Sequence, residues 1–440
     1  MKKVTIIGAG LAGSEAALSL AKLGLQVELI DMKPQAKTPA HESPHFAELV
    51  CTNSLKAKRV SSASGLLKEE LRRLGSQLLP IAEKHAVPAG GALAVDREAF
   101  AREITERIMN DPHIHFRAET VSSLPSARPL IVATGPLTEG GLYESLQKVT
   151  GSEHLRFFDA AAPIVRGDSV DPELSFRQSR YDRGGDDYIN CPLNKEEYEA
   201  FVDALLEAEL AEQSDFDRKL LFEGCMPIEN MAARGRDTLR FGPMKPVGLT
   251  DPRTGRRPWA NLQLRQETAS GDMWNLVGFQ TRLKFPEQRR VFALIPALAH
   301  AEFERYGVMH RNSFIDSPRV LQANLELKSA PGVYVVGQLT GLEGYVPAMM
   351  SGLLVARSLA AEAAGMEMPI LPAETMVGAL VRHITDASIQ DFQPMTASFG
   401  LLPPLPERVK DKQARGEAYA SRAQTAMDVY TKNFNEHQLA

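Results

Sequence analysis

The 440-residue chain is poor in cysteine, with three residues at Cys51, Cys191 and Cys225, and it contains no CxxC or HExxH motif. This excludes a disulfide framework and gives no reason to expect a metal site, and thiols kept reduced suit a cytoplasmic protein. No segment approaches the ~20 uninterrupted apolar residues of a membrane-spanning helix. Glu15 interrupts the apolar N-terminal stretch, which argues against a signal peptide. We therefore expect no membrane association.

Charge of one sign is also not dominant, because the formal net charge is −5. The chain is 44% hydrophobic and 24% charged, which is ordinary for a globular protein, and its length allows two or three domains. The net value does not suggest a nucleic-acid-binding protein, but it hides local patches. Residues 218–290 contain 14 Lys or Arg against 7 Asp or Glu.

Residues 3–33 predict a strand, a glycine turn, a helix and a second strand. The turn has the pattern G-x-G-x-x-G, and Asp31 follows at the end of the second strand. In this context glycines let backbone N–H groups approach a pyrophosphate at a helix N-terminus, and the carboxylate accepts hydrogen bonds from ribose hydroxyls. The expected dinucleotide-binding residues are Gly8, Ala9, Gly10, Leu11, Ala12, Gly13 and Asp31.

A second glycine-spaced strand–turn–helix, "VVGQLTGLEGY", lies some 330 residues after the first. A nicotinamide dehydrogenase does not need such a segment, whereas FAD must be held by distant parts of the chain. The alternative is a glycine-rich turn that packs a helix onto a sheet. The segment "RPLIVATGPLT" also predicts a buried strand and a tight turn. Further FAD-binding residues are expected at Gly135, Gly337, Gly341, Gly344 and Tyr345.

The order of these motifs predicts an α/β protein: a Rossmann-like FAD-binding domain (GR2-like) that is split by a smaller inserted α+β domain. Residues 1–184 form the first part of the FAD-binding domain, 185–305 the inserted substrate domain, and 306–440 the second part with C-terminal helices. No further G-x-G-x-x-G follows a strand. NAD(P)H, as the source of electrons, would therefore dock transiently.

Several motifs together resemble one known family. "GAGLAGSEAA", "CTNSLKA", "ATGPLT", "YINCPLNKEEY", "FEGCMPIE" and "GQLTGLEGYVPAMMSGLLVA" are similar to the bacterial folate- and FAD-dependent tRNA (uracil-5-)-methyltransferases, TrmFO. The likeness runs from residue 1 to about 360, with the motifs in order. The related GidA/MnmG flavoproteins share both glycine motifs but are longer by a helical C-terminal domain.

The resemblance implies methylation of a T-loop uridine of tRNA (nucleotide 54) to 5-methyluridine. The carbon would come from 5,10-methylenetetrahydrofolate and the reducing equivalents from FADH2. The family's two cysteines match Cys51 and Cys225; one adds to C6 of the uracil and the other helps to remove the C5 proton. His310 matches the imidazole that stacks on the folate's pterin ring.

The residues support this chemistry independently. Addition of a thiolate at C6 makes C5 of uracil nucleophilic, and cysteine is the suitable side chain. Three arginines, Arg234, Arg236 and Arg240, follow Cys225 closely and, if near in space, would favour its thiolate and hold RNA phosphate. The alternatives are a buried cysteine and a solvated basic face. Cys51 is not half of a redox pair, because Ser54 and Lys56 stand where a second thiol would be required.

Three other functions remain open from the sequence. The chain could be a flavin oxidoreductase for a small molecule, with its cysteines in the core. It could modify the wobble uridine as GidA does, although the missing C-terminal domain counts against this. Finally, it could be an FAD-bound RNA-binding protein without catalysis. Analysis of the nucleosides of tRNA treated with labelled folate would separate all four.

Overall fold

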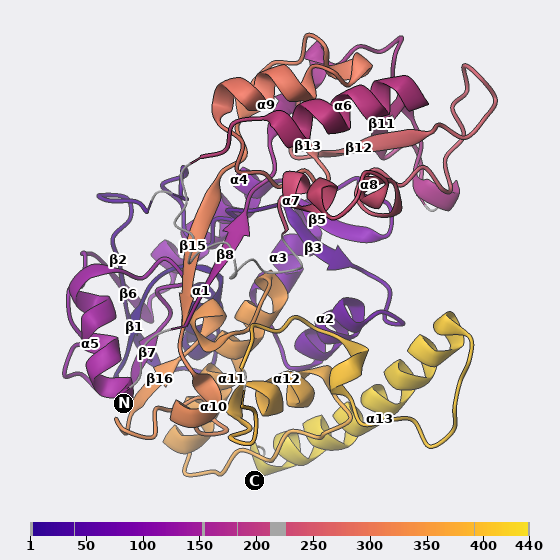
Figure 1. Cartoon of the computed structure of the whole chain (residues 1–440). Coiled ribbons are helices and arrows are strands. Elements are labelled where there is room, and N and C mark those ends of the chain that lie inside the picture. Colours follow the sequence, from indigo (N-terminus) through magenta and orange to yellow (C-terminus); the bar gives the residue numbers. More distant parts are fainter. Residues whose placement is uncertain are drawn as a thin grey trace.

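The computed structural model describes residues 3–38, 40–151, 155–182, 184–211, 226–390 and 392–438. For residues 155–159, 310–311 and 433–438 it describes the backbone alone. Among the helices of these residues, none combines the length and the apolar character that crossing a membrane requires. Two domains are stacked, with the inserted domain at the top of Figure 1 and the FAD-binding domain, which holds both termini, below it.

A five-stranded parallel sheet forms the centre of the FAD-binding domain. The strand order is β16-β7-β1-β2-β6. Its strands are β1 (Lys3–Ile7), β2 (Gln26–Asp31), β6 (Ile114–Ala118), β7 (Leu130–Val132) and β16 (Val333–Val335). The central strands are short and apolar because helices cover both faces of a parallel sheet. The predicted Rossmann-like class is confirmed, and the first and last thirds of the chain meet where β16 pairs with β7.

Two glycine-started helices pack directly against each other beside this sheet. They are α1 (Leu11–Lys22) and α11 (Tyr345–Ala363). Gly352 in α11 allows the close approach, since a Cβ there would lie 2.1 Å from the carbonyl oxygen of Ala12. The two glycine motifs are therefore neighbours in space although far apart in sequence.

Residues 63–110 contain the three helices α2 (Ala63–Arg73), α3 (Leu78–Lys84) and α4 (Arg97–Asn110). Asp96 caps the N-terminus of α4, accepting a hydrogen bond from the Ala99 N–H at 3.0 Å. A small sheet is interleaved with these helices in the order β3-β5-β4, with β3 (Ser54–Ala57), β4 (Ala86–Val87) and β5 (Ala92–Val95). This sheet brings the segment after Cys51 to the boundary between the domains.

The inserted domain is built on a six-stranded sheet in the order β10-β11-β12-β13-β9-β14. Its strands are β9 (Ile164–Arg166), β10 (Phe176–Arg177), β11 (Tyr188–Leu193), β12 (Ala260–Gln266), β13 (Met273–Leu276) and β14 (Phe303–Arg305). Its helices are α6 (Lys195–Glu207), α7 (Ile228–Ala233), α8 (Thr238–Phe241) and α9 (Phe285–Phe292). Helices α6 and α9 lie on the outer side of the sheet (Figure 1). A separate apolar core fills this domain.

The expected boundary at residues 184/185 would divide this sheet, which favours an earlier start for the inserted domain. Strand β9 already belongs to it, pairing with β13 and with β14. These partners are more than 100 residues away, so local sequence patterns could not assign β9 to the insert. The two-stranded ribbon of β8 (Leu155–Ala160) and β15 (Met309–Phe314) joins the domains, and we propose that the insert runs from about 161 to 308.

The remaining elements complete the FAD-binding domain and the turns. The helices are α5 (Gly140–Thr150), α10 (Ser317–Val320), α12 (Met376–Thr385) and α13 (Lys412–Gln438). The short 3-10 helices are η1 (Gly167–Ser169), η2 (Arg180–Asp182), η5 (Pro296–Leu298), η6 (Gly337–Thr340) and η7 (Phe399–Leu401). The C-terminal α13 packs on α2 and buries Ala423, Met427 and Tyr430 in the main core.

Candidate active site

A cavity of about 650 Å³ lies where the carboxyl ends of β1, β2 and β7 face the inserted domain. This edge of a parallel sheet is where ligands of open α/β folds bind. The N-terminus of α1, the start of α11, the Cys51 loop and strands β12 and β13 complete its wall. Both domains therefore contribute to one site.

The first glycine motif builds one end of this cavity. Gly8 has a φ of +99°, and a Cβ there would lie 2.4 Å from the Ala133 carbonyl oxygen. A Cβ at Gly13 would lie 1.8 Å from the Gly8 carbonyl oxygen, so Gly13 serves the packing of helix on strand and does not line the cavity. At Gly10 a Cβ would meet nothing within 4 Å. The first turn of α1 has no side-chain cap, which suits a bound pyrophosphate.

Asp31 closes the same end. Its Oδ2 accepts a hydrogen bond from the Ala9 N–H at 2.6 Å, and its Oδ1 accepts one from the Lys33 N–H at 2.8 Å. Each carboxylate oxygen has a second lone pair that can accept a ribose hydroxyl. Gly8, Ala9, Gly10, Leu11 and Ala12 all line the cavity with Asp31. These residues fit the adenosine and pyrophosphate parts of FAD.

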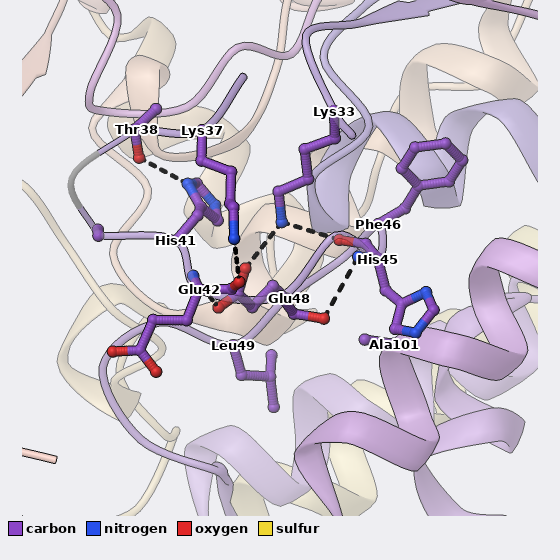
Figure 2. A network of polar contacts seen from close by, with 12 residues as sticks. Lys33, Lys37, Thr38, His41, Glu42, His45, Phe46, Glu48, Leu49 and Ala101 are labelled. Atoms are coloured by element: carbon purple, nitrogen blue, oxygen red, sulfur yellow. Dashed lines mark hydrogen bonds and ion pairs between the residues drawn. The ribbon is translucent and has the colours of Figure 1, made fainter. Parts of the chain in front are cut away.

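A buried ion pair follows Asp31 along the chain. Figure 2 shows the Lys33 ammonium between the Glu48 carboxylate, at 2.7 Å, and the carbonyl oxygen of His45, at 2.8 Å. Burial opposes ionisation of Glu48, but the Lys33 ammonium and the Glu42 N–H hold the pKa of its carboxyl below the usual value. Burial and the Lys33 charge lower the pKa of His41, which also lines the cavity. This network shapes the loop beside Asp31.

The second glycine segment divides between two roles. Gly337 and Gly344, with φ values of +77° and +104°, line the cavity, as does Gly135 after β7. Gly341 does not line it; a Cβ there would lie 2.5 Å from the Phe392 ring, so this glycine allows a turn to pack. The alternative of a packing glycine thus describes Gly341, while its neighbours belong to the cavity wall.

Cys51 lies on the cavity wall and its loop is held by Tyr345. The Tyr345 hydroxyl oxygen accepts hydrogen bonds from the N–H groups of Cys51, at 2.9 Å, and Thr52, at 3.0 Å. Burial, and then the neighbouring Cys51, raise the pKa of Tyr345, which keeps the phenol neutral. The Cys51 thiol is free, half-buried and 3.6 Å from the Ala160 carbonyl oxygen. Tyr345 therefore joins the C-terminal flavin motif to the cysteine loop.

The two other cysteines have different outcomes. Cys191 is fully buried in β11, and burial raises the pKa of its thiol, as suits a core residue. Cys225 lies outside the described residues. The chain is described again from Met226, and the Ile228 N–H donates to the carbonyl oxygen of Gln280 at 2.7 Å, a residue that lines the cavity. His310 lies in β15, and its side chain is outside the described atoms.

The three predicted RNA-binding arginines do not line the cavity. Arg234 ends α7, and Arg236 pairs with Asp203. The Arg240 guanidinium stacks on the Trp259 ring at 3.7 Å. Phe241, beside it, is 82% exposed. These residues form a separate basic and aromatic surface of the inserted domain.

Sequence reasoning missed the polar residues that the inserted domain contributes to the cavity. Arg265 on β12 and Asn275 on β13 line it together with Thr52. Arg265 donates hydrogen bonds to Asn53 Oδ1 at 2.9 Å and to Thr52 Oγ1. The signal was the alternation in "ANLQLRQ", which gives a strand one polar and one apolar face. All seven residues of this strand are buried, so its polar face must meet protein or ligand.

Fold and cavity define a Rossmann-type flavoprotein, and comparison with known proteins gives its family. The family model "Glucose inhibited division protein A" matches residues 3–367. The chain is 52% identical over 425 residues to methylenetetrahydrofolate–tRNA-(uracil-5-)-methyltransferase TrmFO of Heliobacterium modesticaldum, covering 97% of each chain. It is 53% identical over 421 residues to the TrmFO of Desulforamulus reducens, covering 96% of each. The chain belongs to the TrmFO family.

Among solved structures, GidA of Aquifex aeolicus shares the fold. In one crystal form it matches with a TM-score of 0.69 and 14% identity, covering 98% of this chain and 73% of that chain. A second crystal form gives a TM-score of 0.68, with 98% and 76% covered. About a quarter of the GidA chain has no counterpart in the match, in line with the expected difference in length.

Proposed function

We propose that this protein is a folate-dependent tRNA (uracil-5-)-methyltransferase that converts a T-loop uridine to 5-methyluridine. The names of the relatives at 52–53% identity support the reaction. The observation that carries the proposal is Cys51, whose half-buried thiol lies on the wall of the cavity that also contains the dinucleotide-binding glycines. A thiol in this position suits a base that enters from outside.

The chemistry asks for a nucleophile because C5 of uracil does not attack a one-carbon electrophile unaided. A thiolate that adds to C6 turns C5 into an enolate carbon, and a second group must then remove the C5 proton. We assign these two tasks to Cys51 and Cys225. Cys51 has an ordered backbone for this work, because its N–H is bonded to Tyr345. His310 is proposed to stack on the pterin ring of the folate.

FAD fits the cavity through the uncapped first turn of α1, Asp31, Gly337 and Gly344. When bound, it supplies the reducing equivalents that turn a methylene unit into a methyl group. NAD(P)H is proposed to dock transiently as the source of electrons, since the sequence contains no second G-x-G-x-x-G after a strand. The reaction would take place in the cytoplasm.

The surface of Arg234, Arg236 and Arg240 is proposed to hold tRNA outside the cavity. Arginine binds phosphate and stacks on unpaired bases, and an exposed Phe241 beside it offers a further stacking face. The target uridine must leave its stack to reach Cys51, which a site between two domains allows. In this proposal the arginine surface binds the tRNA, while the reaction on the base takes place in the cavity.

One assay tests the proposal. Purified protein is incubated with an unmodified tRNA transcript, NAD(P)H and methylenetetrahydrofolate labelled in its methylene carbon, and the digested nucleosides are separated. We expect label in 5-methyluridine from the T-loop. Label at the wobble position would favour the GidA-like function, and NAD(P)H oxidation without RNA would favour a small-molecule oxidoreductase. Bound but unchanged tRNA would leave an RNA-binding flavoprotein.

A further inference from the structure

The inserted domain presents a pair of polar side chains to the cavity. Arg265 on β12 and Asn275 on β13 are direct partners in the antiparallel register, so their side chains lie on the same face of the sheet. The next pair, Leu264 and Leu276, points to the opposite face and is part of the inserted domain's core. The sheet therefore turns its apolar side to its own helices and this polar pair to the cavity.

Arg265 is a buried cation whose hydrogen bonds go to neutral oxygens within the described part of the chain. It is 8% exposed, and its acceptors are the side-chain oxygens of Thr52, Asn53 and Asn275. A guanidinium keeps its charge in proteins, and a buried charge is costly unless it is satisfied. The hydrogen bond to Thr52 holds the Arg265 guanidinium against the residue that follows Cys51.

Asn275 adds an unsatisfied donor beside this charge. The residue is 2% exposed, and its Nδ2 is buried with no hydrogen-bond partner among the described residues. A buried amide donor without a partner is rare and marks a place where a ligand atom can accept. The cavity wall next to Cys51 thus carries two hydrogen-bond donors, the Arg265 guanidinium and the Asn275 amide. A ligand that binds there should carry a hydrogen-bond acceptor.

We infer that Arg265 and Asn275 bind the conjugated carbonyl oxygen of a planar lactam ring held beside Cys51. This inference rests on the proposed function, in which two substrates carry such a carbonyl: the uracil, at O4, and the pterin of the folate. Two N–H donors that converge on one oxygen form the arrangement that stabilises a developing oxyanion. The proximity to Cys51 favours the uracil.

If the ring is the uracil, the negative charge of the thiolate adduct lies on this carbonyl oxygen, O4. When a thiolate adds to C6, the S–C6 bond forms and the C5=C6 π bond breaks. Its electron pair forms a C4=C5 bond while the C4=O4 π bond breaks and its pair moves onto the oxygen, so the negative charge passes from sulfur to O4. No proton moves and no redox change occurs in this step. A fixed cation near O4 stabilises the negatively charged adduct more than it stabilises the neutral base. It therefore lowers the barrier to addition.

Two measurements on the FAD-loaded enzyme distinguish the two sources. Release of tritium from tRNA labelled at C5 of uridine, in a single turnover at saturating folate, reports addition at C6 and loss of the C5 hydrogen. Titration with tetrahydrofolate without RNA, followed by flavin absorbance, reports pterin binding. We expect Arg265→Gln and Asn275→Ser to slow tritium release by about 10²-fold and about 10-fold, with unchanged affinity for tetrahydrofolate. Arg265→Lys should recover part of the loss, because it restores the charge without the fork.

Asn261→Ser is the matched control. Asn261 lies on the same strand β12, is fully buried and also has an unpartnered atom, Oδ1, but it does not line the cavity. Its variant should release tritium at the normal rate even if it loses stability.

Weaker tetrahydrofolate binding with normal tritium release at saturation would assign the carbonyl to the pterin. Normal values for both measurements in Asn275→Ser and Arg265→Gln, or an equal loss in Asn261→Ser, would overturn the inference. A wild-type enzyme that releases no tritium refutes the proposed function instead, while the titration still tests the site.

Discussion

The hydroxyl oxygen of Tyr345 holds the backbone of Cys51 by accepting its N–H at 2.9 Å, across 294 residues of sequence. It also accepts the next N–H, that of Thr52. Tyr345, the first residue of α11, thus fixes the loop that carries Cys51. Correct placement of the thiol depends on the two halves of the split domain being assembled.

We predict that Tyr345→Phe slows methylation while the protein stays folded. The change leaves two N–H groups of the Cys51 loop without their acceptor, at a cost of about 1–3 kcal/mol. We expect a loss of roughly 10- to 100-fold in the single-turnover rate of 5-methyluridine formation. Tyr430→Phe is the control, because the Tyr430 hydroxyl is buried without a partner among the described residues. An unchanged rate in Tyr345→Phe would mean that the loop is held by its other contacts.

Cys51 and Cys191 should separate activity from stability. Cys51→Ala removes a half-buried thiol on the cavity wall and is predicted to reduce methylation by at least about 10³-fold with little change in melting temperature. Cys191→Ser places a hydroxyl in the apolar core of the inserted domain and is predicted to lower the free energy of unfolding by about 1–3 kcal/mol while the rate stays normal. Both are measured by nucleoside analysis and thermal unfolding. Full activity in Cys51→Ala would remove this thiol from the mechanism.

Much of the FAD-binding half was predictable because its signals are local. The glycines that begin the first turn, Asp31, and Gly337 after the strand at 333–336 can each be recognised from a few neighbouring residues, and all of them line one cavity. The absence of a second thiol excluded a redox pair for Cys51, whereas its catalytic role was expected from the resemblance and stays a prediction. The assignments of Cys225 and His310 rest on the resemblance alone, and they stay predictions.

The residues that sequence reasoning missed depend on pairings over long distances. Strand β9 belongs to the inserted sheet through partners more than 100 residues away, and this pairing is the reason that we propose an earlier start for the insert. Arg265 was counted as one charge in a basic segment, yet it is buried against the Cys51 loop of the other domain. Conversely, Gly341 fits the spacing of the flavin motif but serves packing against Phe392. Spacing predicts a local turn and leaves open which side of it faces a ligand.

Gly10 should be needed by the cofactor and not by the fold. A Cβ at this position meets nothing within 4 Å, so Gly10→Ala should leave the apoprotein as stable as the wild type. The methyl group would occupy space at the uncapped start of α1, where a pyrophosphate binds, and we predict at least about 10-fold weaker FAD binding. Flavin fluorescence titration measures the affinity. Gly91→Ala is the control, since a Cβ there also meets nothing but lies outside the cavity. Equal FAD affinity in all three proteins would contradict the assignment of this cradle.

Glu70 should make stability depend on pH in an unusual direction. Its carboxyl is buried at the start of α12, where it accepts the N–H groups of Met376 and Val377, both at 2.8 Å. Burial raises the pKa of Glu70 to about 7 against an ordinary 4.5. At a pH between 4.5 and 7, the Glu70 carboxyl keeps its proton in the folded protein but has lost it in the unfolded chain. Its contribution to stability is therefore complete below pH 4.5 and is lost as the pH rises through 7.

Urea unfolding at a series of pH values tests this sign. The free energy of unfolding of the wild type relative to Glu70→Gln should fall between pH 4.5 and 7, by up to about 3 kcal/mol. Glu103 provides the opposite case, since burial opposes ionisation but Lys84, His85 and Arg107 together lower the pKa of its carboxyl to about 2. The wild type relative to Glu103→Gln should lose stability as the pH falls below 4.5. If the Glu70 difference instead rose with pH, the two N–H groups at the start of α12 would outweigh burial, and the carboxylate would be the form that the fold prefers.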